Sequence, residues 1–249
     1  EGGHGGVEQF ERGSSLPPSQ QDQGQGDLGA APLGVGPQLV RHADGAPQGG
    51  DGALLVPEKV PGRAEDAGHE GDERARAHPA APLDLSSRGI PGGRAWWMID
   101  LNRLIYGPPP DLLERFRREC PVGLPEARGA LLKVIDQAGQ HFGLTADRFV
   151  LGGFSQGAML ATDVALRLPS APAGLAILSG ALINEAEWRP LLDQAKRGPL
   201  KVLQSHGRQD SILPFPVGMA LHELLLESGA EVEFVAFPGD HEIPTPIVQ

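Results

Sequence analysis

Cysteine is nearly absent from this chain of 249 residues, and long apolar runs are missing altogether. The single cysteine, Cys120, excludes an internal disulfide and is typical of a reducing compartment, so we expect a cytoplasmic protein. The longest apolar window, around residues 174–183, is much shorter than a membrane-spanning helix. The first residues also lack the basic start and apolar run of a signal peptide, so we expect no stable membrane insertion.

Positive charge is scarce as well. Lysine and arginine number 21 against 32 acidic residues, which gives a formal net charge of −11. Proteins that bind nucleic acid cluster lysine and arginine to neutralise phosphates, and the sequence contains no such basic stripe. We therefore expect no nucleic-acid partner.

Aromatic residues are rarest in the first part of the chain. Residues 1–93 contain one of the 12 aromatic residues, Phe10, but 20 of the 35 glycines and 10 of the 24 prolines. Such a composition buries too little apolar area to offset the entropy of the chain. We interpret residues 1–93 as a low-complexity, disordered or irregular region with possible strands at 38–40 and 53–56, and residues 94–249 as the folded domain.

Beyond residue 94, segments with helical periodicity alternate with short apolar runs that predict strands. We expect helices at about 112–118, 123–142, 156–168 and 217–227, and strands at 148–153, 175–178, 200–204 and 231–237. The last strand alternates polar and apolar residues, as a strand near the edge of a sheet does. The order of the elements predicts an α/β fold, a mostly parallel sheet flanked by helices.

The strongest functional motif lies within residues 149–160. An apolar strand meets the sequence Gly-Phe-Ser-Gln-Gly at 153–157, a Gly-x-Ser-x-Gly pattern, and a helix-forming run follows at once. A serine at the tip of such a sharp turn needs neighbours without side chains, because strand and helix approach closely there. This context makes Ser155 a candidate nucleophile.

Partners for this serine are expected in the loops that follow later strands, because functional groups gather at the carboxyl ends of parallel strands. Asp210 follows the strand at 200–204, and His241 follows the strand at 231–237. A serine needs an imidazole to accept its proton, and the imidazole needs a carboxylate to fix its tautomer. We assign these roles to His241 and Asp210.

Other residues near these positions leave alternatives open. Asp240 and Glu242 flank His241, and either is an alternative carboxylate, while Asp210 is then only a turn cap. His206 is an alternative base. It precedes Asp210 by only four residues, which is too close in the chain to reach a shared face easily, so we favour a structural role for His206.

Four apolar residues are candidates for the walls of an acyl-binding pocket. Trp96 and Trp97 form an apolar pair just after the change in composition, and Leu213 and Phe215 follow Asp210. Core packing is the alternative for the two tryptophans, and for at least one of them it is the better interpretation.

Three motifs together resemble the phospholipase/carboxylesterase family, which includes the acyl-protein thioesterases and has the α/β-hydrolase fold. They are Gly-Gly-Phe-Ser-Gln-Gly-Ala-Met at 152–159, His-Gly-x-x-Asp at 206–210 and Gly-Asp-His-Glu-Ile-Pro at 239–244. The resemblance covers about residues 91–244. It implies a serine hydrolase without metal or other cofactor, acting through an acyl-enzyme on small-molecule or acyl-chain esters or thioesters. It also implies the same three catalytic residues, with the backbone N–H of Gln156 as an oxyanion donor.

Both ends of the sequence depart from the family's pattern. The family opens with a strand and a Leu-His-Gly-x-Gly loop that gives a second oxyanion donor, and residues 3–6 and 39–46 match it poorly, which suggests a misread gene start. At the other end, eight residues after His241 leave no room for the usual closing helix, so we expect it to be truncated. Removing one oxyanion donor slows acyl transfer by about 100- to 1000-fold. An alternative function is therefore that of a catalytically impaired remnant that acts as a binding module.

Overall fold

A computed structural model describes residues 53–57, 77–98, 108–192, 199–244 and 247. All of these residues belong to one unit of the chain, Pro37–Gln249. The possible strand at 38–40 and the two glycine-containing segments at 3–6 and 39–46 lie outside the described residues.

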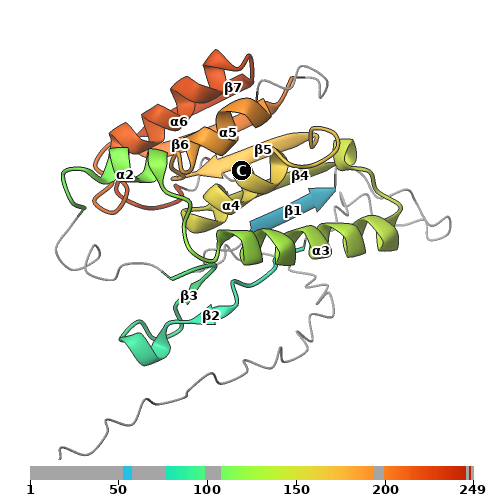
Figure 1. Ribbon diagram of the computed structural model, residues 1–249, viewed down its shortest axis with the longest axis horizontal. Coiled ribbons are helices and arrows are strands. Elements are labelled where there is room, and N and C mark those ends of the chain that lie inside the picture. The colour runs from blue at the N-terminus through green and yellow to red at the C-terminus, as the bar shows by residue number, and fades with distance from the viewer. Residues whose placement is uncertain (1–52, 58–76, 99–107, 193–198, 245–246, 248–249) are drawn as a thin grey trace, which may run out of the picture. The chain divides into compact units, whose positions relative to one another are not determined.

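A five-stranded sheet forms the centre of the described fold, in the order β1-β4-β5-β6-β7 (Figure 1). The four strands β4 (Phe149–Phe154), β5 (Gly174–Leu178), β6 (Lys201–Gly207) and β7 (Glu231–Phe237) are parallel. This confirms the predicted α/β fold and the place of the last strand at an edge. The other edge strand, β1 (Ala53–Pro57), is antiparallel to β4 and coincides with one of the two short apolar segments named above.

Helices follow the strands in alternation, largely at the predicted positions. They are α2 (Leu112–Arg118), α3 (Leu124–Phe142), α4 (Gln156–Ala165), α5 (Glu185–Leu192) and α6 (Phe215–Glu227), with short 3-10 helices at Ser86–Arg88 and Ala146–Arg148. Helix α4 ends at Ala165, three residues earlier than predicted. The chain turns from residue 166 onward, whereas the prediction let the helix continue up to Pro169.

Helix α5 was not predicted, because its eight residues include Pro190, which normally interrupts a helix. Tertiary contacts explain why it forms. The side chain of Trp188 is fully buried, and its indole N–H donates to Oδ1 of Asp163 on α4 at 2.9 Å. The buried carboxylate of Asp163 also binds Nε of Arg128 on α3 at 2.5 Å. One buried carboxylate thus links three helices.

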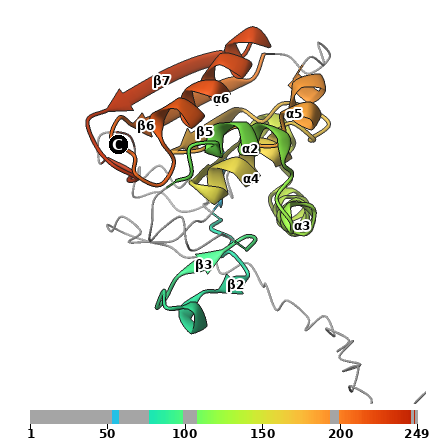
Figure 2. The ribbon, with the colours of Figure 1, turned by 60° about the vertical axis from the view of Figure 1, so that its left-hand side comes forward.

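The two faces of the sheet differ. The register places Leu151, Leu175 and Val202 on one face, where they are buried in the core cluster. Helices α4 and α6 pack against this face, and Figure 2 shows the helices together on this side. The opposite face carries half-buried apolar side chains such as Val150 and Leu203, which line an open hollow of about 360 Å³. The sheet's apolar side chains are therefore buried mainly on the helical side.

A small two-stranded sheet lies between β1 and β4 in the chain. Its strands are β2 (Leu83–Asp84) and β3 (Arg94–Ala95), which pair antiparallel. The backbone of this segment is held in part by the guanidinium of Arg94, which donates to the backbone carbonyls of Ala81 and Pro82. These ordered residues lie on both sides of the predicted domain boundary at residues 93 and 94, and that boundary stays a prediction.

Candidate active site

Ser155 occupies the turn between β4 and α4. Its φ of 54° and ψ of −119° are rarely adopted by residues other than glycine, so the backbone is strained at this point. The strain is held by neighbours: the N–H of Ser155 donates to the carbonyl of Leu178 on β5 at 2.9 Å. A Cβ at Gly153 would lie 2.3 Å from the carbonyl carbon of Gly157, so only glycine fits there. The close approach of strand and helix that the motif predicted is present.

The strand–turn–helix at residues 153–157, which carries Ser155, is called the elbow. Gln156, the first residue of α4, ties this elbow to the two tryptophans. Its Oε1 accepts the backbone N–H of Trp96 at 3.0 Å, and its Nε2 donates to the carbonyl of Trp97 at 3.2 Å. Only the backbone N–H of Gln156 was expected at the site, because no local motif marks a side-chain link between residues about 60 positions apart. At the first position of a helix that backbone N–H has no acceptor within the helix, which leaves it available to a ligand.

Trp96 and Trp97 are both buried in the hydrophobic core cluster, with 4% and 5% of their surfaces exposed. Core packing therefore accounts for both residues, as expected for at least one of them. Their backbone bonds to Gln156 also place them beside the elbow. Their role as walls of an acyl pocket stays a prediction.

Asp210 lies in the loop that follows β6, and its side chain is buried. Its Oδ1 accepts the backbone N–H groups of Ile212 at 3.0 Å and Leu213 at 2.7 Å. Its Oδ2 lies 2.7 Å from Nδ1 of His241. Asp210 therefore caps its own turn and faces the imidazole at the same time, so these two interpretations of the residue are compatible.

His241 follows β7 and is half-buried. Its Nδ1 carries the proton in the contact with Asp210, because a carboxylate only accepts hydrogen bonds. This leaves Nε2 as the nitrogen free to accept a proton. The imidazole packs against the ring of Phe154 with centroids 4.7 Å apart, and Phe154 directly precedes Ser155. The loops after β4, β6 and β7 thus bring the three predicted catalytic residues to one end of the sheet.

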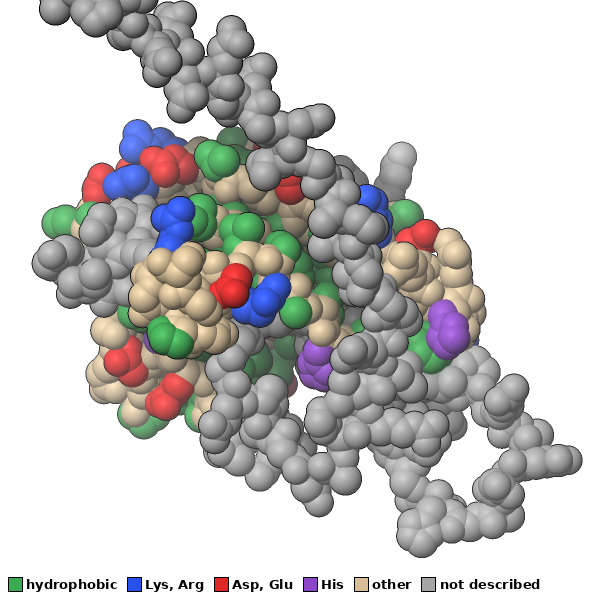
Figure 3. Space-filling model, turned by 90° about the horizontal axis from the view of Figure 1, so that it is seen from below, with side chains coloured by type: hydrophobic (Ala, Val, Ile, Leu, Met, Phe, Trp, Pro, Cys, Tyr) green, Lys and Arg blue, Asp and Glu red, His purple; other side chains and the backbone are tan. Residues whose placement is uncertain are grey.

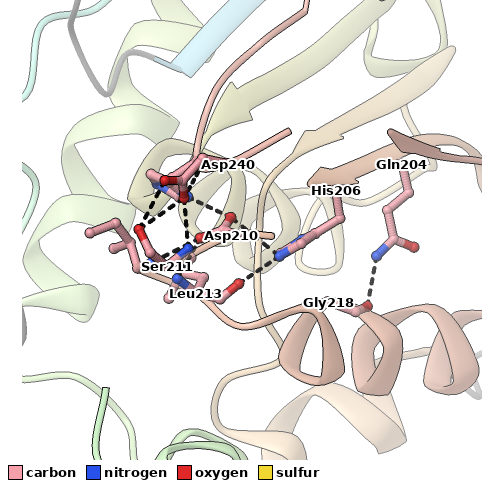
Figure 4. A network of polar contacts seen from close by, with 9 residues as sticks. Gln204, His206, Asp210, Ser211, Leu213, Gly218 and Asp240 are labelled. Atoms are coloured by element: carbon pink, nitrogen blue, oxygen red, sulfur yellow. Dashed lines mark hydrogen bonds and ion pairs between the residues drawn. The ribbon is translucent and has the colours of Figure 1, made fainter. Parts of the chain in front are cut away.

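Asp240, one of the alternative carboxylates, binds different groups. Its Oδ1 accepts the backbone N–H of Ser211 at 2.7 Å, the hydroxyl of Ser211 at 2.9 Å and the backbone N–H of His241 at 2.8 Å (Figure 4). The backbone and side-chain bonds from Ser211 hold the pKa of Asp240 below its usual value of 3.8. The carboxylate that contacts the His241 ring is that of Asp210, whereas Asp240 ties the loop of Asp210 to the loop of His241.

His206, the alternative base, is fully buried on β6. Its Nε2 lies 2.7 Å from the carbonyl oxygen of Leu213 and 3.4 Å from Oδ2 of Asp210. Burial lowers the pKa of His206 below its usual value of 6.5. His206 and Asp210 thus do lie close together, contrary to the expectation that four residues are too few for them to reach a shared face. Strand β6 continues to Gly207, beyond the predicted end at 204, and the loop turns back toward the strand.

Phe215, one of the two other predicted pocket residues, begins α6, and Leu213 lies in the loop just before this helix. Leu213 is buried, and both its backbone N–H and its carbonyl are held, by Asp210 and His206 respectively. The centroid of the Phe215 ring lies 6.0 Å from that of the His206 ring and 5.2 Å from the guanidinium of Arg208. Substrate binding by Leu213 and Phe215 stays a prediction.

Among the described residues, no three His, Cys, Asp or Glu side chains gather in a way that could hold a metal ion. No helix in the described part of the chain is long and apolar enough to cross a membrane. On the face seen in Figure 3, acidic and basic side chains are intermixed rather than separated by sign.

The phospholipase/carboxylesterase family matches residues 114–249, which is more than half of the chain and includes Ser155, Asp210 and His241. The chain belongs to this family. The match confirms the resemblance drawn from the three motifs. The fold of the family agrees with the parallel sheet and its helices, and the predicted α/β-hydrolase class is confirmed.

Individual members of the family are also similar to this chain in sequence. The chain is 31% identical over 98 residues to acyl-protein thioesterase 1 of Neurospora crassa, covering 39% of this chain and 40% of that protein. It is 32% identical over 105 residues to carboxylesterase SOBER1 of Arabidopsis thaliana, covering 39% and 42%. The chain thus spans about 40% of the length of these curated relatives. The crystal structure of esterase PE8 has the same fold, with a TM-score of 0.52 and 24% identity, over 64% of this chain and 68% of that one.

Proposed function

We propose that this member of the phospholipase/carboxylesterase family is a serine hydrolase that cleaves carboxylic esters or thioesters through an acyl-enzyme. The observation that carries the proposal is the 2.7 Å contact between Nδ1 of His241 and Oδ2 of Asp210, with the same imidazole packed on Phe154 beside Ser155. A buried carboxylate that orients an imidazole next to an elbow serine is the arrangement that activates serine as a nucleophile.

In the first half of the proposed reaction, Oγ of Ser155 attacks the carbonyl carbon of the substrate and its proton passes to Nε2 of His241. The new imidazolium is stabilised by the carboxylate of Asp210. The carbonyl oxygen becomes an oxyanion, and the backbone N–H of Gln156 donates to it. When the tetrahedral intermediate collapses, the bond to the leaving alcohol or thiol breaks and His241 returns the proton to that group.

In the second half, water attacks the ester formed on Ser155, and Nε2 of His241 accepts its proton. Collapse of this intermediate releases the carboxylic acid, and His241 returns the proton to Oγ of Ser155. The site then holds its original protonation states, so the reaction needs no metal or redox cofactor.

The relatives narrow the substrate class in this proposal. They are named as an acyl-protein thioesterase and a carboxylesterase, which both cleave an acyl group from oxygen or sulfur. The candidate pocket residues are apolar, Trp96 and Trp97 are bonded to Gln156, and Leu213 is bonded to Asp210, which favours an acyl group with an apolar chain. We infer an acyl-chain ester or thioester as the substrate, with Phe215 as a further candidate wall.

A series of nitrophenyl esters of increasing acyl length, hydrolysed by the wild type and by Ser155→Ala, tests the proposal. We expect measurable kcat/KM for the wild type, and a loss of at least about 1000-fold in the variant, because the acyl-enzyme cannot form. Equal rates for the two folded proteins would contradict the proposal.

A specific observation keeps the second candidate function, an impaired remnant that acts as a binding module. The backbone N–H of Gln156 is the one assigned oxyanion donor, and the segments that could correspond to the family's second-donor loop, residues 3–6 and 39–46, match that loop poorly. The same ester series separates the two functions. A folded wild type that binds an ester analogue but hydrolyses no ester of the series would favour the binding module.

A further inference from the structure

His206 is buried, and it makes polar contacts that a simple packing role does not require. Its side chain has no exposed surface, and it lies on β6 with its ring beside Phe215 and against the backbone of α6. A Cβ at Gly218 would lie 2.4 Å from Nδ1 of His206, so the glycine makes room for the imidazole. Figure 4 shows His206 between this helix and the loop that carries Asp210.

The helix is fixed in this position by a neighbouring bond. Nε2 of Gln204, two residues before His206 on β6, donates to the carbonyl of Gly218 at 2.9 Å. The imidazole therefore has little freedom to move toward α6. The hydrogen-bond partner of its Nε2 lies on the other side, in the loop that carries Asp210.

The contacts of His206 define where its proton lies. Nε2 is 2.7 Å from the carbonyl oxygen of Leu213, and a carbonyl only accepts, so Nε2 carries the hydrogen. Nδ1 is buried and has no hydrogen-bond partner among the described residues. A second proton on Nδ1 would have no acceptor, and burial already lowers the pKa of the ring. The contacts therefore favour a neutral imidazole with its proton on Nε2.

A chain of hydrogen bonds through Leu213 connects His206 to the site of the proposed reaction. The carbonyl of Leu213 is held by His206, and the N–H of the same residue donates to Oδ1 of Asp210. The same Nε2 lies 3.4 Å from Oδ2 of Asp210, the oxygen that binds His241. His206 thus fixes the loop that orients the carboxylate and presents a partial positive charge to the oxygen that faces the catalytic imidazole.

We propose that His206 is a positioning residue that holds Asp210, through Leu213, in the orientation from which Asp210 binds His241. This inference rests on the proposed function, because it assigns His206 a part in the same site. The groups that face the imidazole are Asp210 and Leu213 from the loop, and Gly218 and Phe215 from α6.

Two amide variants separate positioning from packing. In His206→Gln the side-chain nitrogen reaches about the place of Nε2 and can donate to Leu213, whereas in His206→Asn it is too short and lies near the place of Nδ1. We expect His206→Gln to keep a kcat close to that of the wild type. We expect His206→Asn to lower kcat by about 10- to 100-fold with little change in KM, because a small displacement of a catalytic group has effects of that size. Equal kcat values for the two folded variants would overturn the inference.

A measurement on the unaltered protein covers the case in which a variant does not fold. Long-range ¹H–¹⁵N correlation spectra of the ¹⁵N-labelled wild type at pH 7 distinguish the two neutral tautomers of a histidine from its charged form. We expect His206 to be neutral with its proton on Nε2. A proton on Nδ1, or an imidazolium, would overturn the inference whether or not the protein hydrolyses esters. If the wild type hydrolyses no ester but His206 has the expected tautomer, the proposed function fails while the contact to Leu213 stands.

Discussion

The two parts of the candidate site are held in place by different forces. The elbow that carries Ser155 is fixed by backbone packing: every residue of α4 is buried, and Gly153 and Gly157 are in direct contact. The loops that carry Asp210 and His241 are fixed by hydrogen bonds to carboxylates. Three consecutive N–H groups, those of Ser211, Ile212 and Leu213, each donate to an aspartate.

This difference predicts different sensitivities. A packed backbone tolerates almost no added volume, because there is no flexible side chain that can move aside. A hydrogen-bonded loop tolerates a change in volume but depends on the charge and reach of its acceptors. Substitutions at the elbow should therefore affect folding, and substitutions in the loops should affect catalysis.

The largest effect is expected for Gly153→Ala. The added methyl would lie 2.3 Å from the carbonyl carbon and 2.4 Å from the carbonyl oxygen of Gly157. Both atoms belong to the backbone, so β4 and α4 must separate. We expect the free energy of unfolding, measured with urea, to fall by about 3 kcal/mol or more.

A matched control lies on α3. Gly129 lies within this helix, and a Cβ there meets nothing within 4 Å. Gly129→Ala should stabilise the protein by up to about 1 kcal/mol, because alanine favours the helix over glycine. If Gly153→Ala were as stable as Gly129→Ala, close packing would not be what holds the elbow.

A smaller effect, on catalysis rather than folding, is expected for Asp240→Ala. Removal of this carboxylate releases Ser211 and the backbone N–H of His241, so the two loops lose one of their links, whereas the contact of Asp210 with His241 remains. We expect kcat for ester hydrolysis to fall by about 10-fold. Ser211→Ala should have a smaller effect, because the backbone N–H of residue 211 remains. Asp147→Ala, at an exposed position of the second 3-10 helix, is the control and should leave kcat unchanged.

The loss of stability in Asp240→Ala should depend on pH. The pKa of Asp240 is lowered in the folded protein, so its stabilising contribution is fully present above its usual pKa of 3.8 and is lost as the pH falls below that value. The difference in thermal stability between wild type and Asp240→Ala should therefore be constant near neutral pH and shrink in strong acid. A difference that grows in acid would show that Asp240 does not act as a charged acceptor.

Much of the fold could be predicted because its signals are local. The strand, turn and helix around Ser155 are consecutive in the chain, and the parallel strands follow from short apolar runs between helical segments. Helix α5 could not be predicted in this way. Its residues include Pro190, and the helix depends on the contact between Trp188 and Asp163, which are 25 residues apart.

The candidate site could be predicted in its residue types but not in its support. The order of Ser155, Asp210 and His241 follows from strand ends, whereas the links from Asp240 to Ser211 and from Gln156 to Trp96 join residues 29 and 60 positions apart. No periodicity or motif marks such pairs. His206 shows the same limit: its distance to Asp210 depends on where β6 ends, and strand ends are poorly defined by sequence.

The most direct test of the account is the reaction of the folded protein with a fluorophosphonate probe, followed by mass spectrometry of the labelled peptide. We predict that the probe labels Ser155. We also predict that His241→Gln slows the labelling by about 100-fold or more, because the serine loses its general base. A folded wild type that stays unlabelled, or a label that lies on another residue, would contradict the claim that Ser155 is an activated nucleophile.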